Sequence, residues 1–595
     1  MRDNMKACQH TLSDDVIYKE VVVIGNGPSG MVTSFMLAGN VPYLKAIPED
    51  LPIDEMLRAR LSNLPPGQSL YETDLMELAE GLEGRSQNPI PLLVDNLLRP
   101  CADLGIQADS LIEWRYDVEK QIDHVVLGRG PPGGAWHTFP PSVRTLSPAA
   151  WLALPPHSSA GPTPTSRLPA RAVAAYCRRY VQACRLQRYF RSGVIVSSVT
   201  RAPRGAPPCA PACPRNALFC VSGYDKSEGR GFRYLCRRVV VACGGGDRPN
   251  ALPRHLATHA VHSLAAVERG LHLLANHSAN PPPSVLVVGS GVSAADAVRL
   301  ARSAALHVRH VHRAPADALA RLPSQAYPDY CHVYKMMIDG PSGNHPNYTP
   351  YPEHMIVEIT PVQHDSPKIN QVENSLRLKK VKLLNLVTNE TVELTVNLVA
   401  VLIGSKPDLF FLQTNFNLNN IDVKDCIKCM EERKIENEDQ KQCFFKNHWH
   451  YIKAVLGQSI QSCKSRYLNY TEINGNTNTK CIVPDCNKRD KFTDKLVKSE
   501  NGDCKCIEEV KSNVCECQPT NPYSAGIGFG VDPNKPVDGR SNPIAIDKGT
   551  HELLNSPKGI YALGPLTADN FVRFIPGGAL AIVADIHKDT KTTAE

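Results

Sequence analysis

The residues VVVIGNGPSGMVTSFMLAG, at positions 21–39, decide the fold of this chain. An aliphatic run leads into a glycine-rich turn, and the turn leads into a helix-compatible stretch, an order typical of dinucleotide-binding units. Gly25 would make the tight turn, Gly27 would admit a pyrophosphate, and Gly30 would let the helix pack close to the strand. The predicted pyrophosphate-binding turn consists of Gly25, Gly27, Pro28, Ser29 and Gly30. A purely structural turn is the alternative.

An acidic residue that would bind the ribose of this first dinucleotide is not assigned. Glu49 and Asp50 lie about 20 positions after the turn, which is the usual spacing, but no convincing strand precedes them. The better second strand is HVVLGRG at 124–130, which has Leu127 and Gly128 where a carboxylate would stand. The sequence therefore predicts the pyrophosphate contact and leaves the ribose contact open.

The segment PPGGAWH at 131–137 follows that second strand directly. Gly133 and Gly134 supply flexible backbone, and Trp136 supplies a flat apolar neighbour. This combination suits contact with the isoalloxazine ring of a flavin. Ordinary core packing is the alternative for Trp136.

A second glycine-rich turn lies in SVLVVGSGVSAADAVRLARSAALHVRHVHR at 284–313. Its residues Gly289, Gly291 and Ala294 have the G-x-G-x-x-A form that also binds dinucleotides. The next strand ends in His312 and Arg313, whereas an acid there would favour NADH. A cationic end suits the 2′-phosphate of NADPH, because charge-assisted hydrogen bonds to phosphate are strong. A solvent-exposed surface arginine is the alternative for Arg313.

Two such turns in one chain are most economically explained by FAD at the first and NADPH at the second, because hydride then passes from a nicotinamide to a second carrier. The expected fold is α/β, with parallel sheets covered by helices. It contains two Rossmann-like domains: a discontinuous FAD domain and an NADPH domain inserted into it. The expected ranges are 14–262 (FAD domain, first part), 263–394 (NADPH domain), 395–413 (FAD domain, continued), 414–520 (irregular insert) and 521–595 (FAD domain, C-terminal part).

Composition indicates a folded protein and gives no sign of a nucleic-acid partner. The chain has 595 residues, of which 42% are hydrophobic and 21% charged, near the averages for folded proteins. Its formal charge of +7 is too small for a nucleic-acid-binding track. The first twenty residues lack a signal-peptide pattern, and no apolar stretch approaches the length of a membrane helix. We expect an intracellular, cytoplasmic protein with no transmembrane segment and no nucleic-acid partner.

Residues 414–520 interrupt the alternation of strands and helices and contain ten of the 20 cysteines. Cys426 and Cys429 form a C-x-x-C pair of the kind that binds zinc, but no second pair follows at zinc-finger spacing. The segment is rich in Lys, Asn and Glu and poor in apolar residues, which favours disorder. We expect a disordered surface insertion that offers contacts to protein partners, and a zinc site is the alternative.

Further segments extend the pattern beyond the two turns. ACGGGDRP at 242–249, LIGSKP at 402–407 and GIYALG at 559–564 resemble two crossover strands and a late strand of the flavin-containing monooxygenases. The chain more closely resembles the oxidative stress-induced growth inhibitor family. The segments that carry this resemblance are GNGPSG at 25–30, GLEGRSQNP at 81–89, GRGPPGGAWH at 128–137, RTLSP at 144–148, LPSQAYPDYCHVYKMM at 322–337, YPEH at 351–354 and LGPLTADNFVRFIPGGALA at 563–581.

The resemblance implies an NADPH-dependent, FAD-containing monooxygenase-like oxidoreductase linked to restraint of cell growth. NADPH would reduce FAD, and the reduced flavin would react with O₂ to form a C4a-hydroperoxyflavin. This species would transfer one oxygen atom to a small-molecule substrate, and the other atom would leave as water. Such chemistry needs no metal and no side-chain nucleophile, so no catalytic residue and no metal ligand is assigned.

Departures from the broader class keep two other functions open. Gly564 is followed by Pro565 where that class has a Gly-Asp pair that contacts the ribityl chain, so Asp569 or Asn570 is expected to substitute. One alternative is a regulatory binding protein that keeps the fold without useful turnover. The other is an NADPH-dependent disulfide reductase, whose redox pair would have to be Cys426–Cys429.

Overall fold

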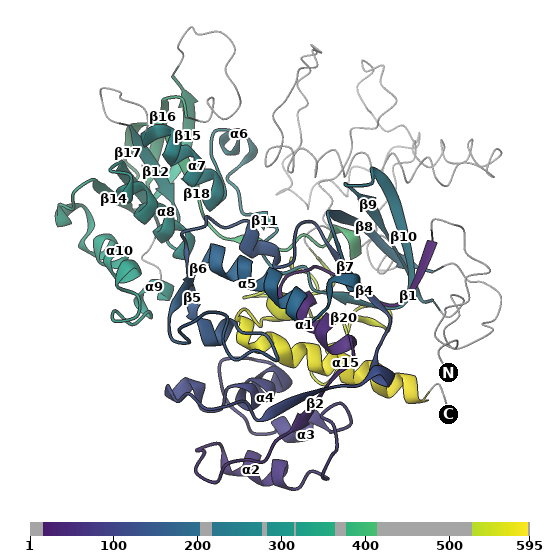
Figure 1. Cartoon of the computed structure of the whole chain (residues 1–595). Coiled ribbons are helices and arrows are strands. Elements are labelled where there is room, and N and C mark those ends of the chain that lie inside the picture. The colour runs from purple at the N-terminus through teal and green to yellow at the C-terminus, as the bar shows by residue number, and fades with distance from the viewer. Residues whose placement is uncertain are drawn as a thin grey trace, which may run out of the picture. The chain divides into compact units, whose positions relative to one another are not determined.

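The computed structural model describes residues 16–202, 217–275, 283–313, 317–362, 376–412 and 526–592. It is a mixed α/β structure with parallel sheets, as the sequence predicted (Figure 1). The cysteine-rich segment 414–520, for which we expected disorder or zinc, lies outside the described residues.

The larger described sheet contains the aliphatic runs at 21–24 and 239–241 as parallel neighbours. It has the strand order β7-β4-β1-β10-β9-β8, and β20 pairs with β10. These strands are β1 (Val16–Ile24), β4 (His124–Gly128), β7 (Phe190–Ser192), β8 (Val194–Arg201), β9 (Phe219–Asp225), β10 (Arg230–Val241) and β20 (Ile560–Ala562). β1 runs parallel to both β4 and β10, and its residues 21–24 are buried, as expected of a parallel sheet covered on both faces. The strand expected at 124–130 is thus the neighbour of β1.

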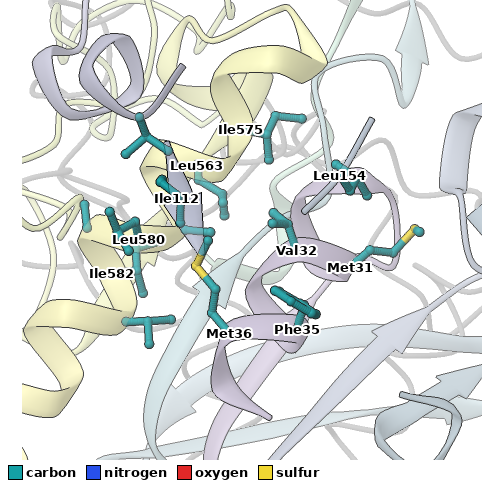
Figure 2. Close-up of a cluster of buried hydrophobic side chains, with 14 of the residues drawn as sticks. Met31, Val32, Phe35, Met36, Ile112, Leu154, Leu563, Ile575, Leu580 and Ile582 are labelled. Atoms are coloured by element: carbon teal, nitrogen blue, oxygen red, sulfur yellow. The ribbon is translucent and has the colours of Figure 1, made fainter. Parts of the chain in front are cut away.

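The helix after the first turn packs against the C-terminal helix. Met31, Val32, Phe35 and Met36 of α1 (Pro28–Leu37) belong to one buried cluster with side chains of α15 (Ile575–Thr592), as Figure 2 shows. Helix α4 (Pro89–Leu98) also contacts α15. The two ends of the sequence therefore build the core beneath the first glycine turn.

The second sheet is entirely parallel. Its order is β14-β13-β12-β18, with β12 (Ser284–Val288), β13 (His307–His312), β14 (Tyr348–Pro352) and β18 (Leu398–Val401). We expected residues 395–413 to continue the first domain, but β18 pairs with β12, so the second sheet extends past residue 394. The apolar run at 394–404 is split between two sheets. Thr391–Val396 forms β17, which belongs to a separate antiparallel sheet with β15 (His354–Pro361) and β16 (Lys379–Asn385).

The remaining described elements cover or connect these sheets. The strands are β2 (Asn40–Leu44), β3 (Ile112–Tyr116), β5 (Arg144–Pro148), β6 (Arg167–Pro169), β11 (Arg248–Pro249), β15 (His354–Pro361), β16 (Lys379–Asn385) and β19 (Ser405–Lys406). The helices are α2 (Glu55–Ser62), α3 (Leu75–Ala79), α5 (Ala170–Ala183), α6 (Arg254–Ala257), α7 (Leu264–Ala275), α8 (Val292–Ser303), α9 (Asp317–Ala320) and α10 (Pro328–Asp339). Across the described ranges, we find no helix with the length and apolar character required to span a bilayer.

Candidate functional site

Two positions of the first turn must be glycine, because other backbone atoms approach them too closely to leave room for a side chain. Gly25 has φ +117°, and a Cβ atom on it would lie 2.3 Å from the carbonyl oxygen of Ala242. A Cβ atom on Gly30 would lie 1.9 Å from the carbonyl oxygen of Gly25. Real Cβ atoms do not come this close to backbone, so a larger residue at either position would force the turn, strand and helix apart.

The third glycine of the turn faces open space. A Cβ atom on Gly27 would meet no atom within 4 Å. Gly27 is also the N-cap of α1; its first turn holds no acidic residue, and no side chain caps it. Pro28 occupies the first helical turn, and the Ser29 side chain is buried beside it. The backbone N–H groups at this helix end are therefore available to an anion, as a pyrophosphate site requires.

The Gly133–Gly134 segment lies against this turn. A Cβ atom on Gly134 would lie 3.1 Å from the Cα atom of Gly27, and the Gly133 N–H donates to the Asn26 carbonyl at 2.9 Å. Both glycines have positive φ, at +120° and +55°. Trp136 is half-buried, packs against the main core cluster, and meets Phe139 edge to face at 5.7 Å.

The end of β4 offers no carboxylate for a ribose. The Asn26 side chain lies over Gly128, where a Cβ atom would be 2.1 Å from the Asn26 amide. Its Nδ2 donates to the Gly130 carbonyl at 2.6 Å. Arg129, the residue after β4, forms an ion pair with Asp247 at 3.4 Å. The ribose contact that the sequence left open is still unassigned.

The loop after β20 also reaches the first turn. A Cβ atom on Gly564, which has φ +74°, would lie 2.5 Å from Ser29 Oγ. Asp569 is 1% exposed and accepts hydrogen bonds from Ser86 Oγ at 2.6 Å and Asn88 Nδ2 at 2.8 Å. The amide of Asn570, which is exposed, donates to the Gly539 carbonyl at 2.9 Å. Asp569 thus ties this loop to residues 86–88.

Burial raises the pKa of Asp569 from its usual 3.8 to about 7, although hydrogen bonds from Ser86 and Asn88 oppose the shift. As pH falls from 8 to 5, the folded protein takes up a proton that the unfolded chain does not bind. This group therefore increases the free energy of unfolding as the solution is acidified through pH 7. We expect Asp569→Asn to remove that increment, measured as the difference between the two proteins in denaturant titrations across this range. Parallel pH profiles would contradict the assignment.

The second turn repeats the geometry of the first. Gly289 has φ +132°, and a Cβ atom on it would lie 2.3 Å from the carbonyl oxygen of Leu402. A Cβ atom on Gly291 would meet nothing within 4 Å, and Gly291 is the uncapped N-cap of α8. Ala294 is fully buried and faces Gly289. The second helix end is thus also open to an anion.

Two buried histidines lie in β13, and Arg313 follows its end. His310 is fully buried, and its Nε2 donates to the Gly289 carbonyl at 2.7 Å, which leaves Nδ1 to accept from Tyr348 Oη at 2.9 Å. Burial lowers the pKa of His310 to about 3, so its ring is neutral. His312 is 2% exposed and lies beside His310, whereas Arg313 is exposed.

A two-stranded ribbon joins the segments that lie beside the two turns. The N–H of Ala242 donates to the carbonyl of Ile24, and the N–H of Leu402 donates to Val288, both at 2.8 Å. A few residues later in each segment, β11 pairs with β19 in antiparallel register. The 242–249 and 402–407 segments therefore occupy equivalent places next to their turns.

Three contributions were missed by reasoning from the sequence. Asn26 shapes the first turn, Ser86 and Asn88 hold Asp569, and His310 holds the second turn. Asn26 and the 86–88 segment stand within quoted motifs, but their partners are distant in sequence.

A surface hollow of about 330 Å³ lies away from both glycine turns, at the C-terminal half of α8. It is lined by Arg299, Arg302, Ser303, Pro346 and Asn347.

Comparison with known proteins identifies the family. No protein-family model matches the chain. Oxidative stress-induced growth inhibitor 1 from Mus musculus is 30% identical over 593 residues, which cover 96% of this chain and 95% of the relative. Oxidative stress-induced growth inhibitor 2 from Homo sapiens is 32% identical over 603 residues, covering 96% and 94%. The chain belongs to the oxidative stress-induced growth inhibitor family. The resemblance inferred from its motifs is confirmed.

Two solved structures similar to this family member come from different classes of enzyme. Bacillithiol disulfide reductase from Staphylococcus aureus has a TM-score of 0.46 and 11% identity, and the match covers 97% of this chain and 99% of that one. Ornithine hydroxylase from Pseudomonas aeruginosa has a TM-score of 0.39 and 12% identity, covering 67% and 85%. Both TM-scores are below 0.5, so neither structure decides between oxygen transfer and disulfide reduction.

Proposed function

We propose that this protein is a flavoprotein oxidoreductase that binds FAD at the first glycine turn, binds NADPH at the second, and acts as a monooxygenase on a small molecule. The proposal rests on one arrangement of glycines that occurs at both turns. Each turn has a glycine that backbone contact requires and a glycine that faces open space at an uncapped helix end. A pyrophosphate fits both positions. We extend the growth-restraining role named in its relatives to this chain.

The residues around the first turn fit a flavin dinucleotide. The α1 N–H groups after Gly27, with Ser29, would hold the pyrophosphate, and the Gly133–Gly134 backbone, Trp136 and the Gly564 loop would surround the rest. Asp569 would act mainly by fixing the Gly564 loop, since both of its oxygens accept bonds from the protein, and exposed Asn570 would contact the ribityl chain. Bound FAD supplies a hydride acceptor that also reacts with O₂.

The residues around the second turn fit NADPH. The α8 N–H groups after Gly291 would hold its pyrophosphate. The hydrogen bond from His310 fixes the position of the Gly289 carbonyl in this turn. Buried Ala294 allows α8 to lie close to β12. The sequence predicted both His312 and Arg313 as ligands of the 2′-phosphate. We assign that role to Arg313, because it is exposed whereas His312 is buried.

Thiols near the first turn do not favour disulfide reduction. Cys243 follows Ala242 at the turn, and Cys177 lies under Gly133, where a Cβ atom would be 2.9 Å from Cys177 Cβ. Burial raises the pKa of Cys243 far above its usual value and that of Cys177 to about 12. Neither is a thiolate at neutral pH, as a redox-active thiol would need to be. Cys426–Cys429, the pair considered from the sequence, lies outside the described residues.

Gly27 and Gly291, the two glycines at which a Cβ atom would meet no neighbour, provide the test of this function. We expect Gly27→Val to fold but to lose flavin absorbance, because valine occupies space that the pyrophosphate needs. Gly291→Val should keep the flavin and lose NADPH oxidation. The measurements are flavin content after purification, NADPH consumption, and hydrogen peroxide release without substrate.

The outcomes separate the alternatives. Wild-type protein that is colourless and takes up no FAD would refute the enzyme. Bound flavin with no NADPH oxidation would instead support a regulatory binding protein that keeps the fold. Loss of flavin from both variants, or from neither, would contradict the assignment of one cofactor to each turn.

The choice of NADPH over NADH depends on Arg313. We expect Arg313→Ala to raise the Kd for NADPH by about 10- to 150-fold, since a charge-assisted hydrogen bond contributes roughly 1.5–3 kcal/mol. The Kd for NADH should stay the same, because NADH lacks the 2′-phosphate. Titration of both nucleotides against the flavin-loaded protein checks this, and equal effects would refute the role of Arg313.

A further inference from the structure

Positive charge is concentrated in one part of this chain. From His124 to Tyr224 the sequence contains twelve arginines, no lysine and no acidic residue. The other 494 residues carry 54 basic and 59 acidic side chains. The net charge of +7 therefore arises entirely from this stretch of 101 residues.

Helix α5 presents part of this charge to solvent. Val173, Cys177 and Tyr180 are buried on its inner face. Arg171, Arg178 and Arg179 are exposed. Positions i, i+7 and i+8 share one side of a helix, so these three guanidinium groups project from the same face. Exposed Arg185 follows the C-terminus of α5, and exposed Arg144 lies on β5, beside the strand that leads into the helix.

We call Arg144, Arg171, Arg178, Arg179 and Arg185 the arginine face. Within the described ranges, none of its side chains forms an ion pair or a hydrogen bond. Two other arginines of the same stretch are paired: Arg167 binds Asp329 at 2.9 Å, and Arg191 binds Asp225 at 2.8 Å. The arginine face is therefore a set of cations that the described part of the chain does not pair.

We propose that the arginine face docks an acidic helix of a partner protein. Guanidinium groups bind carboxylates through two parallel hydrogen bonds, a geometry that lysine cannot offer, and this stretch contains only arginine. Arg171 and Arg178 are about 10.5 Å apart along the α5 axis, at 1.5 Å per residue. Carboxylates seven residues apart on a second helix have the same spacing, so two helices lying side by side bring the charges into register.

Charge complementarity favours a short acidic segment over an extended polyanion. A membrane or a nucleic acid would extend beyond the arginine face onto a remainder whose net charge is negative. Between residues 140 and 202, all of which are described, no large apolar side chain is exposed, and Phe139 just before this range packs edge to face on Trp136. This face therefore has no cluster of apolar side chains to insert into lipid. Helix α5 likewise exposes no aromatic ring on which bases would stack.

The test uses the full-length protein and two peptides of about 20 residues, a length that supports a helix. Both are alanine-rich and contain the same number of glutamates. One places them seven and eight residues apart on a single face, and the other spreads them around the helix. We expect the first to bind more tightly at physiological ionic strength, measured by fluorescence anisotropy. We expect the Arg178→Glu/Arg179→Glu double variant to weaken that binding at least about tenfold.

Controls keep the result specific to this surface. Arg254→Glu removes another exposed arginine, on α6, and should leave peptide binding unchanged. Circular dichroism and flavin content of the double variant should match the wild type, because Arg178 and Arg179 are exposed. An arginine-bearing peptide of the same design should bind the double variant better than the wild type, as charge reversal predicts.

Three outcomes would overturn the proposal. They are equal binding of the two glutamate peptides, undiminished binding by the double variant, and tighter binding of a single-stranded RNA or of phosphatidylserine vesicles than of the one-faced peptide. The proposal does not depend on flavin chemistry, so a colourless protein that binds the peptide as expected would still support it.

Discussion

Replacing Gly30 with alanine is expected to lower the free energy of unfolding by more than about 4 kcal/mol, or to prevent folding altogether. The new Cβ atom would lie 1.9 Å from the Gly25 carbonyl oxygen, 3.0 Å from its carbon and 3.4 Å from Val126. The first two contacts are with backbone, which cannot move aside as the end of a flexible side chain can. Relief requires α1 to separate from β1, which opens the core that α1 shares with α15.

Gly27→Ala is the matched control, three residues earlier in the same turn. Its backbone, at φ −74° and ψ −172°, is extended and accepts any residue, and its Cβ atom would meet no neighbour within 4 Å. We expect a loss of about 1 kcal/mol or less, which is the amount by which alanine is poorer than glycine at a helix N-cap. Denaturant titrations of both variants check the contrast. Equal destabilisation would show that the turn is not held by close approach at Gly30.

The local parts of the fold could be predicted because short sequence patterns encode them. Gly25 and Gly289 follow aliphatic runs, and the spacing to Gly30 and to Ala294 fixes where each helix begins. The second strand at 124–130 was also predictable, since an apolar run stands directly before the PPGGAWH segment. These predictions depend on residues that are neighbours in the chain.

Contacts between distant segments could not be predicted in the same way. Ser86 and Asp569 are 483 residues apart, and no periodicity connects them. The apolar run at 394–404 gives one signal but forms parts of two sheets, because Leu398 pairs with Val285 while Val396 pairs with Lys379. The residue that binds the ribose could not be assigned for a similar reason. The Asn26 amide lies over Gly128, and only the folded turn shows this contact.

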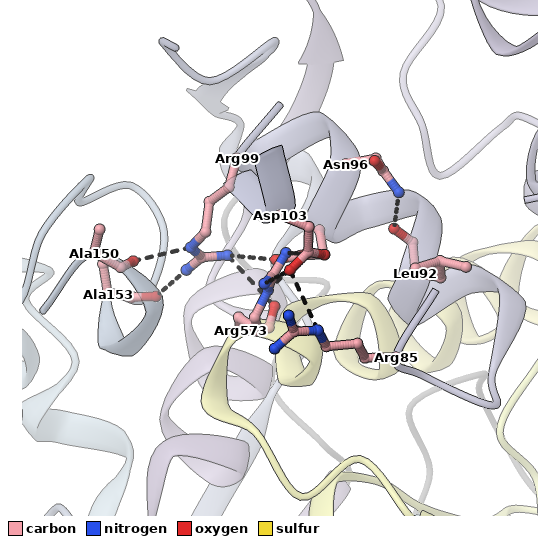
Figure 3. Close-up of polar contacts among 9 residues, drawn as sticks. Arg85, Leu92, Asn96, Arg99, Asp103, Ala150, Ala153 and Arg573 are labelled. Atoms are coloured by element: carbon pink, nitrogen blue, oxygen red, sulfur yellow. Dashed lines mark hydrogen bonds and ion pairs between the residues drawn. The ribbon is translucent and has the colours of Figure 1, made fainter. Parts of the chain in front are cut away.

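The second large effect is expected at Arg573, near the start of α15. Figure 3 shows it among charged side chains from three separate segments. Its Nε donates to Asp95 at 2.8 Å and its Nη1 donates to Asp103 at 2.9 Å. Arg573 and Asp95 are 3% and 2% exposed, and the Arg573 guanidinium lies 4.3 Å from the centre of the Trp151 ring. Truncation to alanine would leave Asp95 buried with only Arg99, 3.2 Å away, as an ionic partner.

We expect Arg573→Ala to lower the free energy of unfolding by about 3–5 kcal/mol, which is the usual cost of removing one member of a buried ion pair. Arg85→Ala is the control, because Arg85 binds the same Asp103 at 3.5 Å but is 57% exposed. Its loss should change the free energy of unfolding by less than about 1 kcal/mol. Denaturant titrations at low and high salt distinguish the two, because added salt screens the Arg85 pair and leaves the buried Arg573 pair almost unaffected. Similar effects from both substitutions would mean that burial does not decide the strength of this cluster. If both effects are small, α15 is held by apolar packing alone.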